Sequence, residues 1–380
     1  MTDRAIQTRE GALILDSHKL SWHYDRVAAW EAGERIAPVG VDMSLTRSCS
    51  AMCSFCYAMM QESQARSNIS EYHALNLLDD FAEMGVRSVS LVSDGESTVS
   101  KAYVPFIQHA ASLGIDVGNA TNAWEWTPDK IEAVLPHLTW IRFTVAAGRP
   151  ESYARIMYKG SEHTHVFDRA MSHIRYAVEL KRKNFFPVTL GIQMVLMPDF
   201  RDEIIPFAQL GLDLGVDYAV IKHCSDDEQG TLGIDYSRYA PLHPLLEQAE
   251  AMSNDKTKVV VKWSKIKDGD KPTYQRFYGP QFLLQISGSG LVAPSGMFFN
   301  ARHSKFHIGN FTEERMKNIW KSNSYWRVMR YLSSPYFNAQ TMMGTLPIQH
   351  YVNVALDNHL KKIQIIKPGR GKKPLHVNFL

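Results

Sequence analysis

The sequence is poor in cysteine, with only four in 380 residues. So few cysteines exclude a disulfide scaffold and favour a reducing compartment. The sequence also lacks an apolar run as long as a membrane span, and its N-terminus carries no apolar signal segment. We therefore expect a cytoplasmic protein without a membrane partner. The formal charge of +3 is small, which makes nucleic acid an unlikely partner.

The remaining composition is that of an ordinary globular protein, with 45% hydrophobic and 21% charged residues. A chain of 380 residues is long enough for one large α/β domain and a smaller appendage. Composition therefore limits the class of protein, whereas the chemistry has to be inferred from local motifs.

Three of the four cysteines, Cys49, Cys53 and Cys56, fall within eight consecutive residues at C-x3-C-x2-C spacing. A short loop allows three thiolates to converge on one side of a metal cluster. Structural zinc sites and electron-transfer clusters normally take four protein ligands. Three ligands match a [4Fe–4S] cluster in which one iron remains open to an exchangeable group. A zinc knuckle or a set of unligated thiols is the alternative.

Apolar strand patterns and helical patterns alternate regularly from about residue 39 to residue 222. Strands are predicted at 39–45, 86–92, 115–121, 140–145, 187–196 and 218–222, with helices at 71–84, 103–113, 166–181 and 201–214 and another beginning at 128. Repeats of this kind form a parallel barrel or a doubly wound sheet. The chemistry of such folds collects at the carboxyl ends of the strands, and the cysteine loop follows the first strand.

The spacing of the three cysteines resembles the signature of the radical S-adenosylmethionine (SAM) superfamily, whose core is a partial (β/α)6 barrel. The resemblance implies a [4Fe–4S] cluster held by Cys49, Cys53 and Cys56, with SAM on the open iron. One electron, supplied by a donor such as flavodoxin or ferredoxin, would cleave SAM to a 5′-deoxyadenosyl radical that abstracts hydrogen from a substrate. Phe55 matches the aromatic position near the adenine.

The resemblance also implies a set of SAM-binding residues at the strand ends. They are Phe55, Ser93, Asp94, Gly95, Glu96, Asn122, Thr144 and Gln193. Ser93–Glu96 matches a Gly-Gly-Glu motif that holds the amino group of SAM, with Asp94 in place of the first glycine. Carbonyl and carboxylate oxygens accept hydrogen bonds from an ammonium group, and glycine permits close approach. Thr144 is our candidate on its strand, and Arg142 is interpreted as facing the other way.

Structural explanations stay open for several of these positions. Ser93–Glu96 can be an ordinary polar turn, Asn122 a turn cap and Gln193 a buried, satisfied glutamine. Cys224 ends the sixth predicted strand, and it is either a catalytic hydrogen donor or an inert buried thiol.

The segment 283–322 resembles the C-terminal SPASM or twitch extension of some superfamily members, including the strings Ile308-Gly309-Asn310 and Ile319-Trp320-Lys321-Ser322. That extension binds auxiliary clusters through cysteines. Here Ser295 occupies a cysteine position and no cysteine follows Cys224, which excludes an auxiliary cluster. An overall redox-neutral reaction, such as an epimerisation or a rearrangement, then fits best. A metal site at His303 and His307 remains an alternative.

We therefore predict an α/β protein with a lead-in at 1–38, a radical SAM partial barrel at 39–264, a smaller SPASM/twitch-like α+β domain at 265–360 and a basic tail at 361–380. Within the tail, we expect 361–373 to be flexible. The predicted function is SAM cleavage followed by hydrogen abstraction from a small-molecule or peptide substrate. The alternatives are a SPASM-type maturase that modifies peptides or proteins, and a non-catalytic iron–sulfur or zinc protein.

Overall fold

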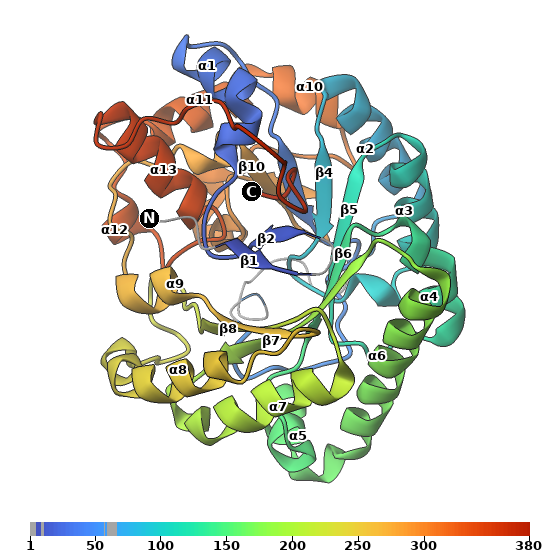
Figure 1. Ribbon diagram of the computed structural model, residues 1–380. Helices are drawn as coiled ribbons and strands as arrows, with labels where there is room; N and C mark the ends of the chain where they lie inside the picture. The colour runs from blue at the N-terminus through green and yellow to red at the C-terminus, as the bar shows by residue number, and fades with distance from the viewer. Residues whose placement is uncertain (1–4, 9–10, 57, 59–66) are drawn as a thin grey trace.

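The protein is built on one large open sheet, seen end-on in Figure 1. The computed structural model describes residues 5–8, 11–56, 58 and 67–380. Within them, ten strands form this sheet in the order β12-β11-β10-β3-β4-β5-β6-β7-β8-β9. The parallel strands are β3 (Gly40–Met43), β4 (Ser88–Leu91), β5 (Asp116–Thr121), β6 (Trp140–Thr144), β7 (Thr189–Leu196), β8 (Tyr218–His223), β9 (Lys258–Val261) and β10 (Leu283–Ile286). The sheet curves as a barrel does (Figure 1). The barrel is partial because its two edge strands, β12 and β9, do not pair with each other within the described residues.

Helices cover the outside of the barrel and return the chain between strands (Figure 1). They are α2 (Glu71–Met84), α3 (Tyr103–Ser112), α4 (Pro128–Val134), α5 (Pro150–Tyr158), α6 (His165–Asn184), α7 (Ile204–Leu214) and α8 (His243–Ala251). Local signals fix their ends: Ser70 caps the first turn of α2, and Gly85 ends it in a left-handed conformation. The predicted α/β class is confirmed, whereas α5 was not predicted. None of the described helices combines the length and apolar composition of a membrane span.

The C-terminal third continues the same sheet. Strand β10 pairs in parallel with β3, and β11 (Leu291–Ala293) and β12 (Gly309–Asn310) add antiparallel strands at the edge. The other α-helices of the described residues are α1 (Tyr24–Glu31), which precedes the barrel, and α9 (Trp263–Asp268), α10 (Met316–Lys321), α11 (Asn323–Leu332), α12 (Ala339–Met342) and α13 (His350–Leu360). Phe298 and Trp326 belong to the same apolar core as Val41 of β3. The sheet therefore runs across the domain change that the sequence predicted near Ser264.

Both chain ends pack against the amino ends of the barrel strands. The hairpin of β1 (Ala5–Gln7) and β2 (Ala12–Ile14) accepts a hydrogen bond from Leu375 N–H to the Ala12 carbonyl at 2.8 Å. Asn378 accepts a bond from Ser88 Oγ at 2.7 Å and donates to Asp116 Oδ2 at 2.8 Å. Figure 1 places the C-terminus near the middle of the ring of strands. The last residues of the predicted basic tail are therefore held by hydrogen bonds to β4 and β5.

Candidate active site

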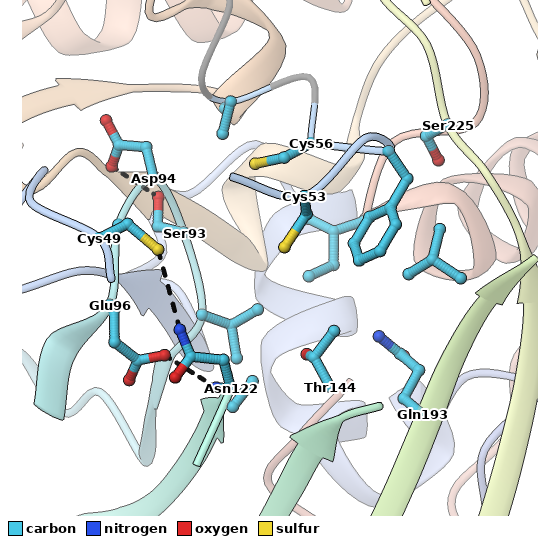
Figure 2. A pocket seen from close by; sticks show the side chains of 18 of the residues that line it. Cys49, Cys53, Cys56, Ser93, Asp94, Glu96, Asn122, Thr144, Gln193 and Ser225 are labelled. Carbon is cyan, nitrogen blue, oxygen red and sulfur yellow. Dashed lines mark hydrogen bonds between the residues drawn. The ribbon is translucent and has the colours of Figure 1, made fainter. Parts of the chain in front are cut away.

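A cavity of about 250 Å³ opens at the carboxyl ends of the strands. Its wall includes Phe55, the three clustered cysteines and the predicted polar residues, namely Cys49, Cys53, Cys56, Ser93, Asp94, Gly95, Glu96, Asn122, Thr144 and Gln193. In Figure 2, the ends of the Thr144 and Gln193 side chains point toward the space below the Cys53 sulfur. The fold thus brings residues from the ends of five strands to one site.

The cysteine loop follows β3 and rests on the end of helix α5. Met52 N–H donates to the Met157 carbonyl at 2.9 Å, and Ser54 N–H donates to the Ile156 carbonyl at 2.8 Å. The Cys53 thiol contacts the Met157 sulfur at 3.6 Å. Sequence reasoning missed this support, because nothing near the cysteines in the chain indicates that α5 packs beside them.

The three thiols suit a cluster better than a single metal ion. They form no disulfide and all line the cavity. Among the described residues, no three His, Cys, Asp or Glu side chains form a site for one metal ion. In a [4Fe–4S] cluster each cysteine binds a different iron, so the sulfurs need not converge on one point. Burial, followed by the charge of Glu96, raises the pKa of Cys49 to about 12, so iron binding has to displace thiol protons.

Glu96 is buried below the cysteine loop and is nearly saturated by donors of its own chain. Thr98 Oγ donates to its Oε1 at 2.7 Å, and Asn122 N–H donates to its Oε2 at 2.8 Å. Burial raises the pKa of Glu96, and these hydrogen bonds oppose the shift. By contrast, the carbonyl oxygens of residues 93–95 accept no hydrogen bond within the described part of the chain. Those carbonyls are therefore the acceptors available to an ammonium group.

Gly95 is the position where the segment after β4 passes closest to the cysteine loop. Its φ is +128°, and a Cβ at this position would lie 2.0 Å from the Thr46 carbonyl oxygen. The Glu96 N–H donates to the Ser48 carbonyl at 2.9 Å. Only glycine allows both the backbone conformation and the contact, so this residue sets the distance between the thiols and the carbonyl groups.

Asn122 connects the end of β5 to the cysteine loop. Its Oδ1 accepts a bond from Trp124 N–H at 3.0 Å, which is the capping role that the sequence left open. Its Nδ2 donates to Ser50 Oγ at 3.1 Å and lies 4.0 Å from Cys49 Sγ. Polar groups beside cluster sulfurs tune the reduction potential, so Asn122 would add an electrostatic role to its structural one if Cys49 held a cluster.

Strands β6 and β7 supply the floor of the cavity. The Gln193 Oε1 atom is buried without a hydrogen-bond partner among the described residues, so it is not the satisfied glutamine of the alternative interpretation. Arg142 lines the cavity together with Thr144. The interpretation that Arg142 faces the other way is wrong, because side chains two residues apart on a strand share a face.

Cys224 is the candidate that the fold does not bring to the cavity. Its side chain is completely buried, and its sulfur lies 3.8 Å from the Phe55 carbonyl oxygen. The neighbouring Ser225 lines the cavity instead. This placement argues against the predicted role as a hydrogen donor and favours packing behind the cysteine loop.

The contacts of the Asp94 side chain explain why an aspartate occupies the first glycine position of the Gly-Gly-Glu pattern. Its carboxylate pairs with Arg47 Nε at 3.0 Å and accepts bonds from Ser287 Oγ at 2.6 Å and Gly288 N–H at 2.9 Å. The turn between β10 and β11 is thereby fastened to the segment after β4. The side chain is 3% exposed, and its bonds are internal to the protein.

Replacing Asp94 with alanine should lower the free energy of unfolding by about 3 kcal/mol, because it removes the buried carboxylate that pairs with Arg47 and accepts the bonds of Ser287 and Gly288. Urea denaturation measures the change. Asp199 is a matched control, since its ion pair with Arg238 is exposed and should contribute less than about 1 kcal/mol. Equal losses in the two variants would contradict the proposed tether.

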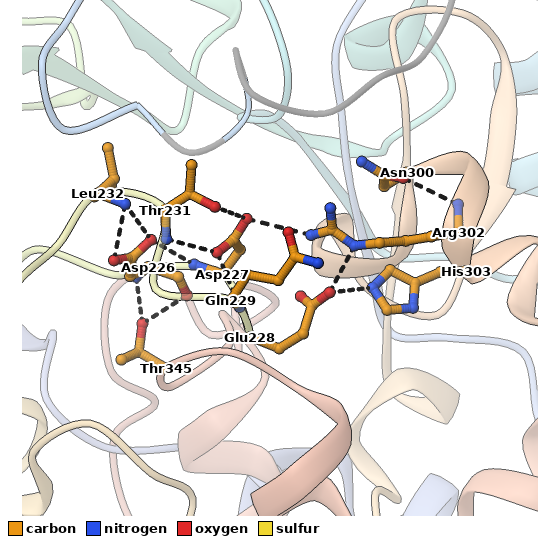
Figure 3. A network of polar contacts seen from close by, with 10 residues as sticks. All are labelled: Asp226, Asp227, Glu228, Gln229, Thr231, Leu232, Asn300, Arg302, His303 and Thr345. Atoms are coloured by element: carbon orange, nitrogen blue, oxygen red, sulfur yellow. Dashed lines mark hydrogen bonds and ion pairs between the residues drawn. The ribbon is translucent and has the colours of Figure 1, made fainter.

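His303 and His307, where the sequence left a metal site as an alternative, contact different partners in the structure. His303 Nε2 contacts Glu228 Oε1 at 2.9 Å, whereas His307 Nε2 contacts the Phe298 carbonyl at 2.8 Å. Figure 3 shows the first contact within a network in which Arg302 also donates to Glu228, at 2.7 Å. The network fastens the loop after β8 to the segment after β11, so His303 has a structural explanation.

Residues 43–210 match the family model described as Radical SAM superfamily. The matched segment begins in β3, contains the cysteine loop and ends in α7. These residues therefore form a radical SAM domain, which spans less than half of the chain. No curated protein sequence matches the chain.

Solved structures give the same assignment of the fold. The chain is similar to Streptococcus suis SuiB bound to S-adenosylmethionine, with a TM-score of 0.61, 15% identity and coverage of 81% of this chain and 72% of SuiB. It is also similar to native anSMEcpe with bound AdoMet, with a TM-score of 0.57, 12% identity and coverage of 87% and 98%. The structural similarity establishes the fold. The sequence identities are too low to identify the reaction.

Proposed function

We propose that the protein is a radical SAM enzyme that cleaves SAM reductively and removes a hydrogen atom from a substrate held inside the barrel. The observation that carries the proposal is the cavity itself. Three thiols line the same cavity as a segment whose carbonyl groups accept no hydrogen bond from the described residues, within a radical SAM domain.

Cys49, Cys53 and Cys56 would hold a [4Fe–4S] cluster, with one iron left for SAM. When bound, the cluster supplies the electron that splits SAM into methionine and a 5′-deoxyadenosyl radical. The carbonyl oxygens of residues 93–95 accept hydrogen bonds from the SAM ammonium group, and Glu96 keeps this segment and Asn122 in place. Phe55 contacts the adenine, while Thr144 and Gln193 contact the ribose.

The C-terminal segment closes one side of the cavity and would act as a SPASM/twitch-like cover without a cluster. Ser295, at the predicted cysteine position, is buried and donates to Gln285 Oε1 at 3.3 Å. Gln285, Gly296 and Phe299 line the cavity. Exclusion of water at this wall protects a radical, and a chain without an auxiliary cluster favours an overall redox-neutral reaction.

The test is SAM cleavage by anaerobically reconstituted protein. With dithionite as reductant, the protein should convert SAM to 5′-deoxyadenosine and methionine, both quantified by chromatography. Iron, sulfide and the visible absorbance of the cluster are measured on the same sample. Protein with a full cluster and no 5′-deoxyadenosine would contradict the proposal and favour the non-catalytic iron–sulfur alternative, whereas colourless protein with zinc would favour the zinc alternative. Reduced flavodoxin or ferredoxin should replace dithionite.

A peptide maturase is the second candidate. The neighbouring folds include SuiB bound to the precursor peptide SuiA and anSMEcpe with AdoMet and the Kp18Cys peptide. A peptide would enter from the open end of the cavity, beside the segment after β11. Reaction mixtures with a peptide substrate would show a mass change in the peptide that depends on SAM, whereas a small substrate leaves peptides unchanged.

A further inference from the structure

The interior of this barrel is polar where closed barrels are filled with branched apolar side chains. A second cavity lies deeper, toward the amino ends of the strands, and is lined by Asp42, Ser88 and Ser90. Arg142, Gln193 and Lys222 line both cavities. The two cavities below the cysteine loop therefore share polar residues on their walls.

Four cations meet at the boundary between the two cavities. Arg142 lies on β6, Lys222 on β8, Lys262 directly after β9 and Lys265 in α9. Burial and the mutual repulsion of these groups lower the pKa of Lys222 to about 8 and of Lys262 to about 7. We name Arg142, Lys222 and Lys265, the three that line both cavities, the cation floor.

Few groups of the protein neutralise the positive charge of the cation floor. No ion pair joins its residues to a carboxylate within the described part of the chain. The Arg142 Nε atom is buried without a hydrogen-bond partner there. Lys265 Nζ lies 5.4 Å from the Tyr351 ring centre and 3.5 Å from the Pro347 carbonyl oxygen. Burial lowers the pKa of Lys265 well below its usual range, so Arg142 and Lys222 carry most of the positive charge that has no carboxylate partner here.

Two acidic side chains near the cation floor, Asp16 and Asp42, do not neutralise it. Asp16 accepts hydrogen bonds from other residues, and Asp42 is poorly ionised. Asp16 accepts bonds from Ser264 Oγ at 2.5 Å and Tyr351 OH at 2.7 Å. Burial raises the pKa of Asp42 to about 7, although Ser90 and Arg142 oppose the shift. Buried charge of one sign is costly unless an opposite charge neutralises it. A ligand that supplies the missing negative charge would therefore bind in this hollow.

We propose that the cation floor binds a carboxylate or phosphate group of the substrate and thereby places the rest of the molecule under the cysteine loop. The substrate is then a small anionic molecule. The proposal deepens the proposed function and rests on it, since that function makes the cavity above the floor the place of SAM.

Anion binding tests the proposal without SAM cleavage. Inorganic phosphate and acetate are titrated separately into the cluster-loaded protein by calorimetry, which also distinguishes the two anions. Wild-type protein should bind one of them saturably, and Lys222→Met should weaken binding by roughly 30-fold or more because it removes a buried charged partner. Lys222→Arg should retain most of the affinity. Lys101→Met is the matched control at an exposed lysine, and it should bind as wild type does.

Measuring SAM affinity shows whether the cation floor binds a carboxylate of the substrate or the carboxylate of SAM. Equilibrium binding of SAM to cluster-loaded Lys222→Met should match that of the wild type. A loss of SAM affinity would assign the cation floor to the SAM carboxylate and overturn the proposal. Absence of saturable anion binding in wild-type protein, or equal binding in Lys222→Met, would also overturn it. A failure of the proposed function shows separately, as missing 5′-deoxyadenosine.

Discussion

Replacing Cys49, Cys53 or Cys56 with alanine should abolish cluster binding and, with it, the formation of 5′-deoxyadenosine. Each thiol lines the same cavity, and no other cysteine does. Reconstituted wild-type protein should contain about four irons per chain, and each variant should lose the iron and the visible absorbance of a [4Fe–4S] cluster. The measurements are iron and sulfide analysis, absorbance, and chromatography of the SAM products.

Cys224→Ala is the matched control, because it removes the one remaining thiol from a fully buried position outside the cavity. This variant should keep its iron and its product, with a loss in unfolding free energy of about 1 kcal/mol. Loss of the cluster in Cys224→Ala, or full iron content in Cys53→Ala, would overturn the assignment of ligands.

Gly95→Ala should damage both stability and SAM cleavage. The new Cβ would lie 2.0 Å from the Thr46 carbonyl oxygen, and the backbone φ of +128° is unfavourable for alanine. Strain and overpacking together should lower the unfolding free energy by about 3 kcal/mol. Relief of the contact shifts the segment after β4 relative to the cysteine loop, and such displacement should reduce 5′-deoxyadenosine formation by roughly 100-fold.

Gly114→Ala isolates the backbone contribution. Gly114 also has a positive φ, of +72°, but no atom lies within 4 Å of the position that an added Cβ would occupy. This variant should lose about 1 kcal/mol of stability and retain SAM cleavage. If Gly95→Ala behaved like Gly114→Ala in urea denaturation and in product formation, the close approach between Gly95 and Thr46 would have no functional importance.

Local patterns predicted most of the barrel. The helix at 71–84 was placed correctly because Ser70 and Gly85 are capping residues at its two ends. The α/β alternation was confirmed because each buried parallel strand is a short apolar run between helical patterns. The hairpin of β1 and β2 was missed, because three-residue strands carry no usable periodicity.

The site was predictable where residues form a short motif or stand at a recognisable place on a predicted strand, as Asn122, Thr144 and Gln193 do. The cysteine loop and the segment Ser93–Glu96 are visible as motifs, and both line the cavity. The cation floor was missed, because its members come from β6, β8 and α9 and share no spacing. The sequence shows that Cys224 follows β8. It does not show the direction of the side chain, because that direction depends on packing.

The sequence alone determined the alternation of strands and helices, the three thiols and the absence of further cysteines, because each is a property of neighbouring residues. Tertiary structure decided that β10 lies beside β3, that the end of the chain returns to β4, and that lysines distant in sequence meet within the barrel. These arrangements depend on which distant segments bury one another, and the free energy of that burial is distributed over contacts that no local pattern encodes.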